Sequence, residues 1–198
     1  MTKEDFIKFA SQGNSRVSVN KVIKNFEGSP LQVYKTLNNK NSFLFESASN
    51  KGKWSRYSII GTESNEMIKV EDNKISYIND SKVEEIKTND PLDWIEKFYS
   101  KNKVINLPKD VPFSGGLVGY FGYETIRFIE SKLIVEKKDS LSVPDIFLFV
   151  CNEIIIFDNL KKCIHIIINA KTNNEDSYEN SIERIDEIEK LIFNKVNT

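Results

Sequence analysis

The hydrophobic positions of the chain follow two patterns, and each pattern predicts one kind of secondary structure. Where hydrophobic and polar residues alternate, as near Phe43-Leu-Phe-Glu-Ser47, the period of two is typical of a half-buried strand. Asp72-Asn73 separates two short apolar runs and indicates a hairpin. The strands predicted in this way cover residues 16–26, 42–48, 54–61, 67–70, 75–78, 144–157 and 163–168.

Helices are predicted where a capping residue precedes apolar residues three or four positions apart. Thr2 caps the first of them. Ser29-Pro30 and Asp90-Pro91 each supply an N-cap residue followed by a proline suited to the first helical position. A fourth, amphipathic helix is predicted over residues 175–196. Its inward-facing residues are expected to be Ile182, Ile185, Ile188 and Ile192.

This order of elements predicts an α+β fold, in which mostly antiparallel sheets are packed with helices. The chain has 198 residues, of which 39% are hydrophobic. A chain of this length buries roughly 70% of the surface of its unfolded form, so a sizeable core is expected. No internal repeat or Gly/Ser linker interrupts the sequence. We therefore predict one domain over residues 1–198.

The charge balance and the absence of targeting signals narrow the class of protein. A net charge of −1 argues against nucleic acid or an anionic membrane surface as the partner. Residues 1–15 lack the apolar stretch of a secretory signal, and the most apolar run, residues 146–157, is too short to span a bilayer. Cys151 and Cys163 form no disulfide framework and are expected to be reduced. These features predict a cytoplasmic protein.

Four glycines between Gly115 and Gly122 invite comparison with phosphate-binding loops. Their spacing matches neither the P-loop nor the dinucleotide-binding fingerprint. It is more typical of a strand that bends sharply or passes close to a neighbouring backbone. Tyr120 and Phe121, within this stretch, are expected to belong to the hydrophobic core.

No residue pattern predicts a metal or cofactor site in this segment. The single histidine, His165, lies between two isoleucines of a predicted strand, and no second histidine or carboxylate stands at ligand spacing. The residues do not form a catalytic constellation of their own.

Three polar residues near the first predicted strands have open interpretations. Glu46 and Ser47 end an apolar strand, which in isolation indicates only a strand that runs into solvent. Arg56 lies between aromatic residues, where it can stack on a ring, bind a carboxylate, or remain a surface cation.

Four motifs follow one another in a recognisable order. They are Phe43-Leu-Phe-Glu-Ser47, Trp54-Ser-Arg-Tyr-Ser-Ile-Ile-Gly61, Gly115-Gly-Leu-Val-Gly-Tyr-Phe-Gly-Tyr123, and Pro144-Asp145 before a strand that ends Ile156-Phe-Asp158. Together they resemble the N-terminal domain of anthranilate synthase component I, one of the chorismate-utilising enzymes. The resemblance runs from the Ser29-Pro30 helix to the strand at Cys163, which is most of the chain.

The resemblance implies a regulatory portion with no catalytic residues in this segment. Members of the family are much longer, and their chorismate and magnesium sites lie in a C-terminal chorismate-binding domain whose motifs are absent here. The parent enzyme would convert chorismate and ammonia to anthranilate and pyruvate. A glutamine amidotransferase subunit would supply the ammonia, and magnesium is expected only in the catalytic domain.

The resemblance further implies a feedback site for L-tryptophan. The family's Leu-Leu-Glu-Ser motif corresponds to Leu44-Phe-Glu-Ser47, with Phe45 as a departure at an apolar position. Ser47 would then hydrogen-bond the ligand, Glu46 would meet its ammonium group, and Arg56 would pair with its carboxylate. Such a pocket must meet both charges and supply an apolar wall for the indole. Part of that wall is expected to come from the C-terminal domain.

Two other functions stay open. Aminodeoxychorismate synthase component I shares the fold and has a similar serine-bearing strand, and it would place the parent in the folate pathway. Glu46 before Ser47 favours anthranilate synthase. The other alternative is a stand-alone module that senses an amino acid. A chorismate-binding domain in the same reading frame downstream would exclude that module.

Overall fold

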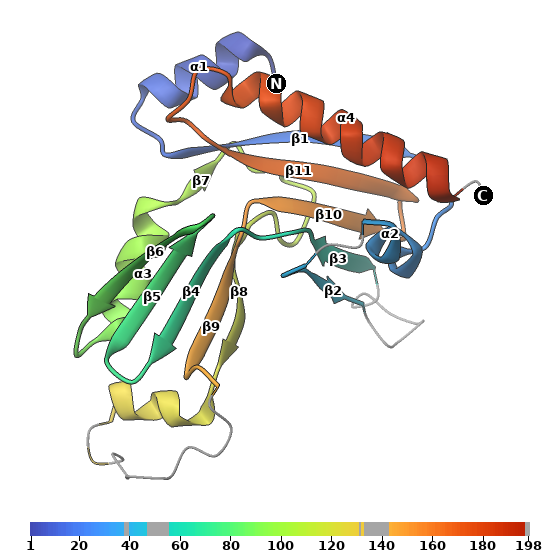
Figure 1. The fold of residues 1–198 in the computed structure, drawn as a ribbon. Coiled ribbons are helices and arrows are strands. Elements are labelled where there is room, and N and C mark those ends of the chain that lie inside the picture. Colours follow the sequence, from blue (N-terminus) through green and yellow to red (C-terminus); the bar gives the residue numbers. More distant parts are fainter. Residues whose placement is uncertain (38–39, 47–55, 131, 133–142, 197–198) are drawn as a thin grey trace. The chain divides into compact units, whose positions relative to one another are not determined.

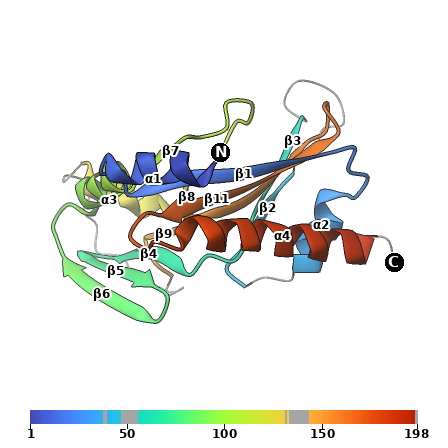
Figure 2. The same cartoon turned by 90° about the horizontal axis from the view of Figure 1, so that it is seen from above.

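The computed structural model describes residues 1–37, 40–46, 56–130, 132 and 143–196, and Figures 1 and 2 show its ribbon from two sides. The chain divides into two compact units. The first comprises Met1–Ser64, Asn102–Gly116 and Cys151–Thr198, and the second comprises Asn65–Lys101 and Leu117–Val150. Each unit contains one sheet in which antiparallel pairs dominate, so the predicted α+β class is confirmed.

The sheet of the first unit has six strands, in the order β2-β3-β10-β11-β1-β7. Its pairs are antiparallel except for β1 and β7, which are parallel. The strands are β1 (Arg16–Lys24), β2 (Phe43–Phe45), β3 (Tyr57–Gly61), β7 (Val104–Ile105), β10 (Glu153–Asp158) and β11 (Cys163–Lys171). The strands predicted over residues 16–26 and 163–168 are thus confirmed as β1 and β11.

Three helices pack on one face of this sheet, namely α1 (Lys3–Ser11), α2 (Pro30–Leu37) and α4 (Ser177–Val196). Thr2 begins α1 with a capping box: the Thr2 hydroxyl accepts from the backbone N–H of Asp5, and the Asp5 carboxylate accepts from that of Thr2. Ser29 likewise accepts from the backbone N–H of Gln32 at 3.2 Å. The predicted starts of α1 and α2 are confirmed, because each cap depends only on residues within one turn. Helix α4 begins at Ser177, two residues after the predicted start.

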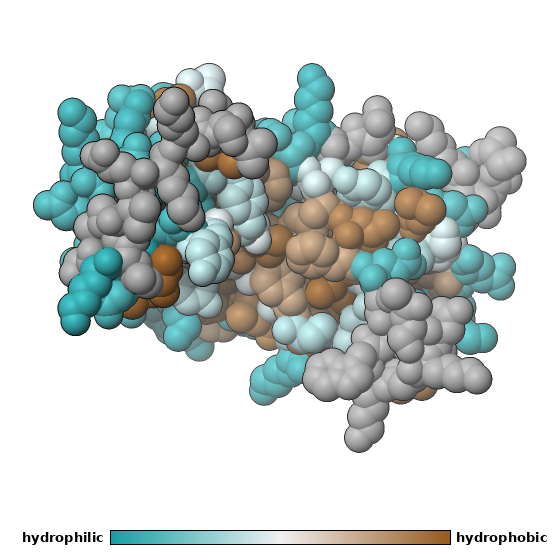
Figure 3. All heavy atoms as spheres, turned by 90° about the horizontal axis from the view of Figure 1, so that it is seen from below, coloured by the Kyte–Doolittle hydropathy of each residue, from teal (hydrophilic) through white to brown (hydrophobic). Residues whose placement is uncertain are grey.

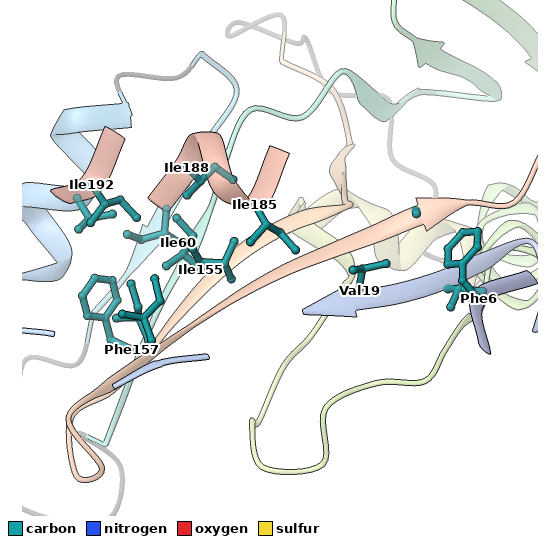
Figure 4. Close-up of a cluster of buried hydrophobic side chains, with 14 residues drawn as sticks. Phe6, Val19, Ile60, Ile155, Phe157, Ile185, Ile188 and Ile192 are labelled. Carbon is teal, nitrogen blue, oxygen red and sulfur yellow. The ribbon is translucent and has the colours of Figure 1, made fainter. Parts of the chain in front are cut away.

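The core of the first unit lies between this sheet and its helices (Figure 4). Ile185, Ile188 and Ile192 of α4 are at most 2% exposed and face β3 and β10. The prediction that Ile182 also faces inward is wrong, because its side chain is 37% exposed. At about 100° per residue, Ile182 projects roughly 90° away from the mean direction of the other three isoleucines.

The sheet of the second unit has five strands, in the order β6-β5-β4-β9-β8. They are β4 (Glu66–Glu71), β5 (Lys74–Asn79), β6 (Lys82–Lys87), β8 (Gly116–Phe121) and β9 (Ile146–Cys151), with helix α3 (Pro91–Lys101) and the 3-10 helix η2 (Tyr123–Phe128) in the same unit. The predicted hairpin at Asp72-Asn73 is confirmed as β4–β5. Strand β6 has no counterpart in the prediction, because all of its residues except Ile86 are exposed and its sequence shows no alternation.

The prediction of a single strand over residues 144–157 is wrong, because the chain passes from one sheet to the other at Asn152. Strand β9, before it, pairs with β4 of the second unit, whereas β10, after it, pairs with β3 and β11 of the first. The Asn152 carbonyl accepts the N–H of Asn169 at 2.7 Å, and its side chain accepts from Arg16 at 2.5 Å. These bonds satisfy a polar residue that interrupts an apolar run.

Close backbone approach is the role of the glycine-rich segment, as predicted. A Cβ atom on Gly119 of β8 would overlap the carbonyl oxygen of Phe147 in β9. Gly115 has a φ of 137°, which residues with a side chain rarely adopt. The expectation that Tyr120 and Phe121 are core residues is wrong, since they are 42% and 54% exposed. They lie on β8, which is an edge strand.

Two further expectations concern the cysteines and membrane-spanning helices. Cys151 and Cys163 are free and buried, as predicted. Burial raises the pKa of Cys151 to about 12. Within the described part of the chain, no helix is long and apolar enough to cross a membrane.

Candidate functional site

Two of the three residues implicated by the motifs lie at the same end of the strand pair β2–β3. These strands are antiparallel, with Phe45 opposite Ile59. Glu46 directly follows β2 and Arg56 directly precedes β3, which places both at this end of the pair. Glu46 is exposed, and none of the ion pairs among the described residues joins it to Arg56. Ser47 lies outside the described residues.

Strand β2 presents aromatic side chains next to Glu46. The ring centroids of Phe43 and Phe45 are 4.7 Å apart, and Phe45 is 54% exposed. Gly61 stands opposite Phe43 on β3, where any side chain would overlap the Phe43 ring. Figure 3 views the side of the molecule opposite to α4 and shows hydrophobic residues at that surface. The strand end therefore combines an exposed carboxylate with exposed apolar surface.

Arg56 is held by a buried carboxylate for which the sequence motifs imply no role. Its Nε and Nη2 donate to Oδ1 and Oδ2 of Asp158, at 3.0 and 2.6 Å. The guanidinium also lies over the ring of Tyr57, 4.7 Å from the ring centroid. The Arg56 side chain is 29% exposed, whereas that of Asp158 is fully buried at 0%. The hydrogen bond with Asp158 raises the pKa of Arg56, so this side chain stays a cation.

Asp158 is itself fixed by the turn that joins β10 to β11. Its Oδ1 accepts the backbone N–H groups of Leu160 at 3.1 Å and Lys161 at 3.0 Å. Burial raises the pKa of the Asp158 carboxyl, but the hydrogen bonds from Arg56 and the turn outweigh burial, and the net pKa lies below its ordinary value. A carboxylate that ends an apolar strand at a turn, as in Ile156-Phe-Asp158, is the sequence signal that points to this residue.

Residues 106–114, between β7 and β8, cross the face of the six-stranded sheet opposite to the helices, and we call them the crossing segment. The amide of Asn169 donates to the Ser114 carbonyl at 2.8 Å, and the Tyr57 hydroxyl donates to the Asp110 carbonyl at 3.1 Å. Lys161 forms an ion pair with the Asp110 carboxylate at 3.0 Å, and this bond lowers the pKa of Asp110. Through Tyr57 and Lys161, the crossing segment is linked to the guanidinium and its carboxylate anchor.

The only histidine of the chain lies on the same strand as Cys163, within the sheet. His165 is 5% exposed, and its Nε2 is 3.7 Å from the Sγ of Cys163. Burial lowers the pKa of His165 and raises that of Cys163, so both groups are neutral at pH 7. A buried neutral thiol suits packing better than nucleophilic attack. Among the described residues, no three His, Cys, Asp or Glu side chains gather where they could hold a metal ion.

The chain is similar to curated enzymes over nearly all of its length. It is 35% identical over 192 residues to anthranilate synthase component 1 of Pseudomonas aeruginosa, which covers 95% of this chain and 39% of that protein. It is 32% identical over 193 residues to anthranilate synthase component 1 of Neisseria meningitidis serogroup B, with the same two coverages, 95% and 39%. The chain thus spans about two fifths of the length of these relatives.

A solved structure and a family model agree with these relatives. The crystal structure of anthranilate synthase component I from Streptococcus pneumoniae TIGR4 aligns with a TM-score of 0.53 at 23% identity, over 84% of this chain and 36% of that one. This likeness shows the fold. Residues 40–197 match the family model described as chorismate binding enzyme. Because that match and the 35% identical relative each cover most of the chain, the chain belongs to the family of chorismate-binding enzymes.

Proposed function

We propose that this chain is the regulatory, tryptophan-binding portion of an anthranilate synthase component I. The curated relatives described above carry that name, which favours this parent over aminodeoxychorismate synthase. The observation that carries the proposal is the placement of Glu46 and Arg56 at one end of the β2–β3 pair, beside the exposed ring of Phe45.

A free amino acid suits this strand end because it carries two opposite charges on one carbon. In the proposed complex Glu46 receives the ammonium group. Asp158 engages Nε and Nη2 of Arg56, so the ligand carboxylate is received by Nη1. Phe45 supplies part of the apolar wall against the indole. Ser47, the next residue after Glu46, adds a hydroxyl group for a hydrogen bond.

Catalysis is assigned to the part of the parent that the relatives have beyond the two fifths matched here. There a C-terminal chorismate-binding domain with magnesium converts chorismate and ammonia to anthranilate and pyruvate, a lyase reaction of tryptophan biosynthesis in the cytoplasm. A glutamine amidotransferase subunit supplies the ammonia. Tryptophan is the end product of this pathway, so its binding here acts as feedback inhibition. The 198-residue chain alone should produce no anthranilate fluorescence from chorismate, ammonium and magnesium.

The proposal is tested by tryptophan inhibition of the complete polypeptide that carries this sequence. The ratio of anthranilate formation with and without tryptophan is measured for the wild type and for Glu46→Gln. A hydrogen bond to a charged group contributes about 1.5–3 kcal/mol, so the variant should need about tenfold to hundredfold more tryptophan for half inhibition.

Glu84→Gln is the matched control, because Glu84 is an exposed glutamate on β6 of the second unit. It should leave the ratio unchanged. A wild type that tryptophan does not inhibit would overturn the regulatory function. Equal inhibition of the wild type and Glu46→Gln would show that tryptophan does not bind at this strand end.

A further inference from the structure

The guanidinium of Arg56 needs an anchor if it is to receive a ligand carboxylate. The Arg56 backbone is tied to the β10–β11 turn, since its carbonyl accepts the N–H of Asn159 at 2.8 Å. This backbone bond does not by itself fix the orientation of the long side chain. A flexible arginine loses rotamer entropy when a ligand fixes it, so a guanidinium that is oriented beforehand binds a carboxylate more tightly.

Asp158 supplies that orientation. Its two oxygens take the Nε and Nη2 of Arg56 in a fork, at 3.0 and 2.6 Å. Its own rotation is blocked, because Oδ1 also accepts two backbone N–H groups of the turn, from Leu160 and Lys161. The pair therefore has one buried end, at the carboxylate, and one accessible end, at the 29% exposed arginine. The ring of Tyr57 supports one face of the guanidinium.

We propose that Asp158 is a positioning residue of the amino-acid site, which holds Arg56 so that Nη1 receives the ligand carboxylate. This inference rests on the proposed function. Asp158 does not touch the ligand and acts only through Arg56. The negative charge of Asp158 also partly neutralises the Arg56 cation, and this neutralisation weakens the attraction of Arg56 for the ligand carboxylate. The orientation effect is the larger one here, because paired contacts between guanidinium and carboxylate depend on alignment as well as on charge.

The test compares two ligands that differ only in the carboxylate. Tryptophan has ammonium, indole and carboxylate groups, whereas tryptamine lacks the carboxylate. Calorimetry with the complete polypeptide measures both ligands against the wild type and Asp158→Asn. The asparagine keeps an acceptor for the turn but places an N–H₂ group against Nη2 of Arg56. Tryptophan affinity should fall about tenfold, and tryptamine affinity should change by less than about twofold.

Two controls separate positioning from a general loss of structure. Asp145→Asn is matched, because the Asp145 carboxylate also accepts from an arginine, Arg127 at 2.6 Å, and from a backbone N–H, but in the second unit. It should leave tryptophan affinity unchanged. In an Arg56→Ala background, Asp158→Asn should have no further effect on tryptophan affinity, because the residue through which it acts is gone.

The outcomes distinguish this inference from the function on which it rests. No tryptophan binding by the wild type would overturn both. Tryptophan binding that is unchanged or tighter in Asp158→Asn, or an equal loss of tryptophan and tryptamine, would overturn the positioning role alone. If Asp158→Asn does not fold, Asp158→Glu replaces it, since one added methylene displaces the carboxylate and the guanidinium it holds. The same difference between the two ligands is then expected.

Discussion

The two hairpins β10–β11 and β4–β5 differ in how many of their faces are buried. In β10 and β11 nearly every residue is buried, because helices cover one face and the crossing segment bonds to the other. In β4 buried residues alternate with half-buried ones, and in β5 most are half-buried. Helix α3 packs against one face of that sheet through Ile95. A continuous apolar run thus marks the strands with two covered faces, and alternation marks the strands with one.

The number of buried faces determines how strongly a polar residue in a strand indicates a function. At the open end of β5 a charged side chain reaches water, as in the exposed ion pair of Lys74 with Glu85 of β6, which contributes at most about 1 kcal/mol. On β10–β11 a polar group loses its hydration and needs a partner. Asp158 and Asn169 have such partners, one in Arg56 and the other in the crossing segment. Buried polar residues such as these two are therefore more informative about function than exposed ones.

The largest expected effect tests whether the second face of β10 is covered. Ile156 lies on that face and is 0% exposed, whereas Val83 on β6 is 59% exposed. Ile156→Ala should lower the free energy of unfolding by about 2–5 kcal/mol, and Val83→Ala by less than about 0.5 kcal/mol. Urea unfolding of both variants measures this. Similar values for the two would show that the second face of β10 is not shielded.

The next effect concerns the apolar wall that the end of the β2–β3 pair is expected to lack without the rest of the parent protein. An indole buries about 150–250 Å² when enclosed, and losing half of this at about 25 cal/mol per Å² costs roughly 2–3 kcal/mol. The 198-residue chain should therefore bind tryptophan about thirtyfold to hundredfold more weakly than the complete polypeptide. Calorimetry on both proteins decides the matter. Equal affinities would mean a complete pocket in this chain and would favour the stand-alone sensor.

A smaller effect is expected from Ser47→Phe in the complete polypeptide. If Ser47 bonds a charged group of tryptophan, the loss is about 1.5–3 kcal/mol, which relieves inhibition about tenfold to hundredfold. The readout is the ratio of rates with and without tryptophan. Ser81→Phe, in the exposed turn between β5 and β6, is the control in the other unit. Inhibition that survives Ser47→Phe unchanged would remove Ser47 from the site.

The smallest effect is a pH dependence that His165 gives to the doubly buried hairpin. Burial holds the pKa of His165 below its ordinary 6.5, so the unfolded chain binds more protons as the pH falls below that value. Stability should then decline from pH 6.5 downward, by at most about 1.4 kcal/mol per pH unit. The lowered pKa of Asp158 adds a separate loss below its ordinary 3.8.

Urea unfolding between pH 7 and 5 measures the histidine contribution. His165→Leu should flatten the stability profile there while leaving the decline below pH 3.8. Because His165 is the only histidine of the chain, an unchanged slope in this variant would assign the dependence to other groups.

Most elements were predictable because their signals are local. The capping box at Thr2 and the Ser29-Pro30 start act within one helical turn, and the Asp72-Asn73 turn acts within one hairpin. The arrangement of the candidate site was predictable only in part. The motifs pointed to Glu46 and Arg56, and the structure places both at one strand end. The contact between Asp158 and Arg56 was not predictable, because the two residues lie 102 positions apart in sequence.

The sequence by itself determined the helix starts, the apolar strands and the close glycine approach at Gly119, since propensity, capping and side-chain size act on neighbouring residues. Only the tertiary structure decided that the run around Asn152 is divided between two sheets and that Tyr120 stays at the surface. It also decided that Asp158 is buried against Arg56. Long-range strand pairing selects which face of a segment meets another, and that choice is not encoded in any one segment.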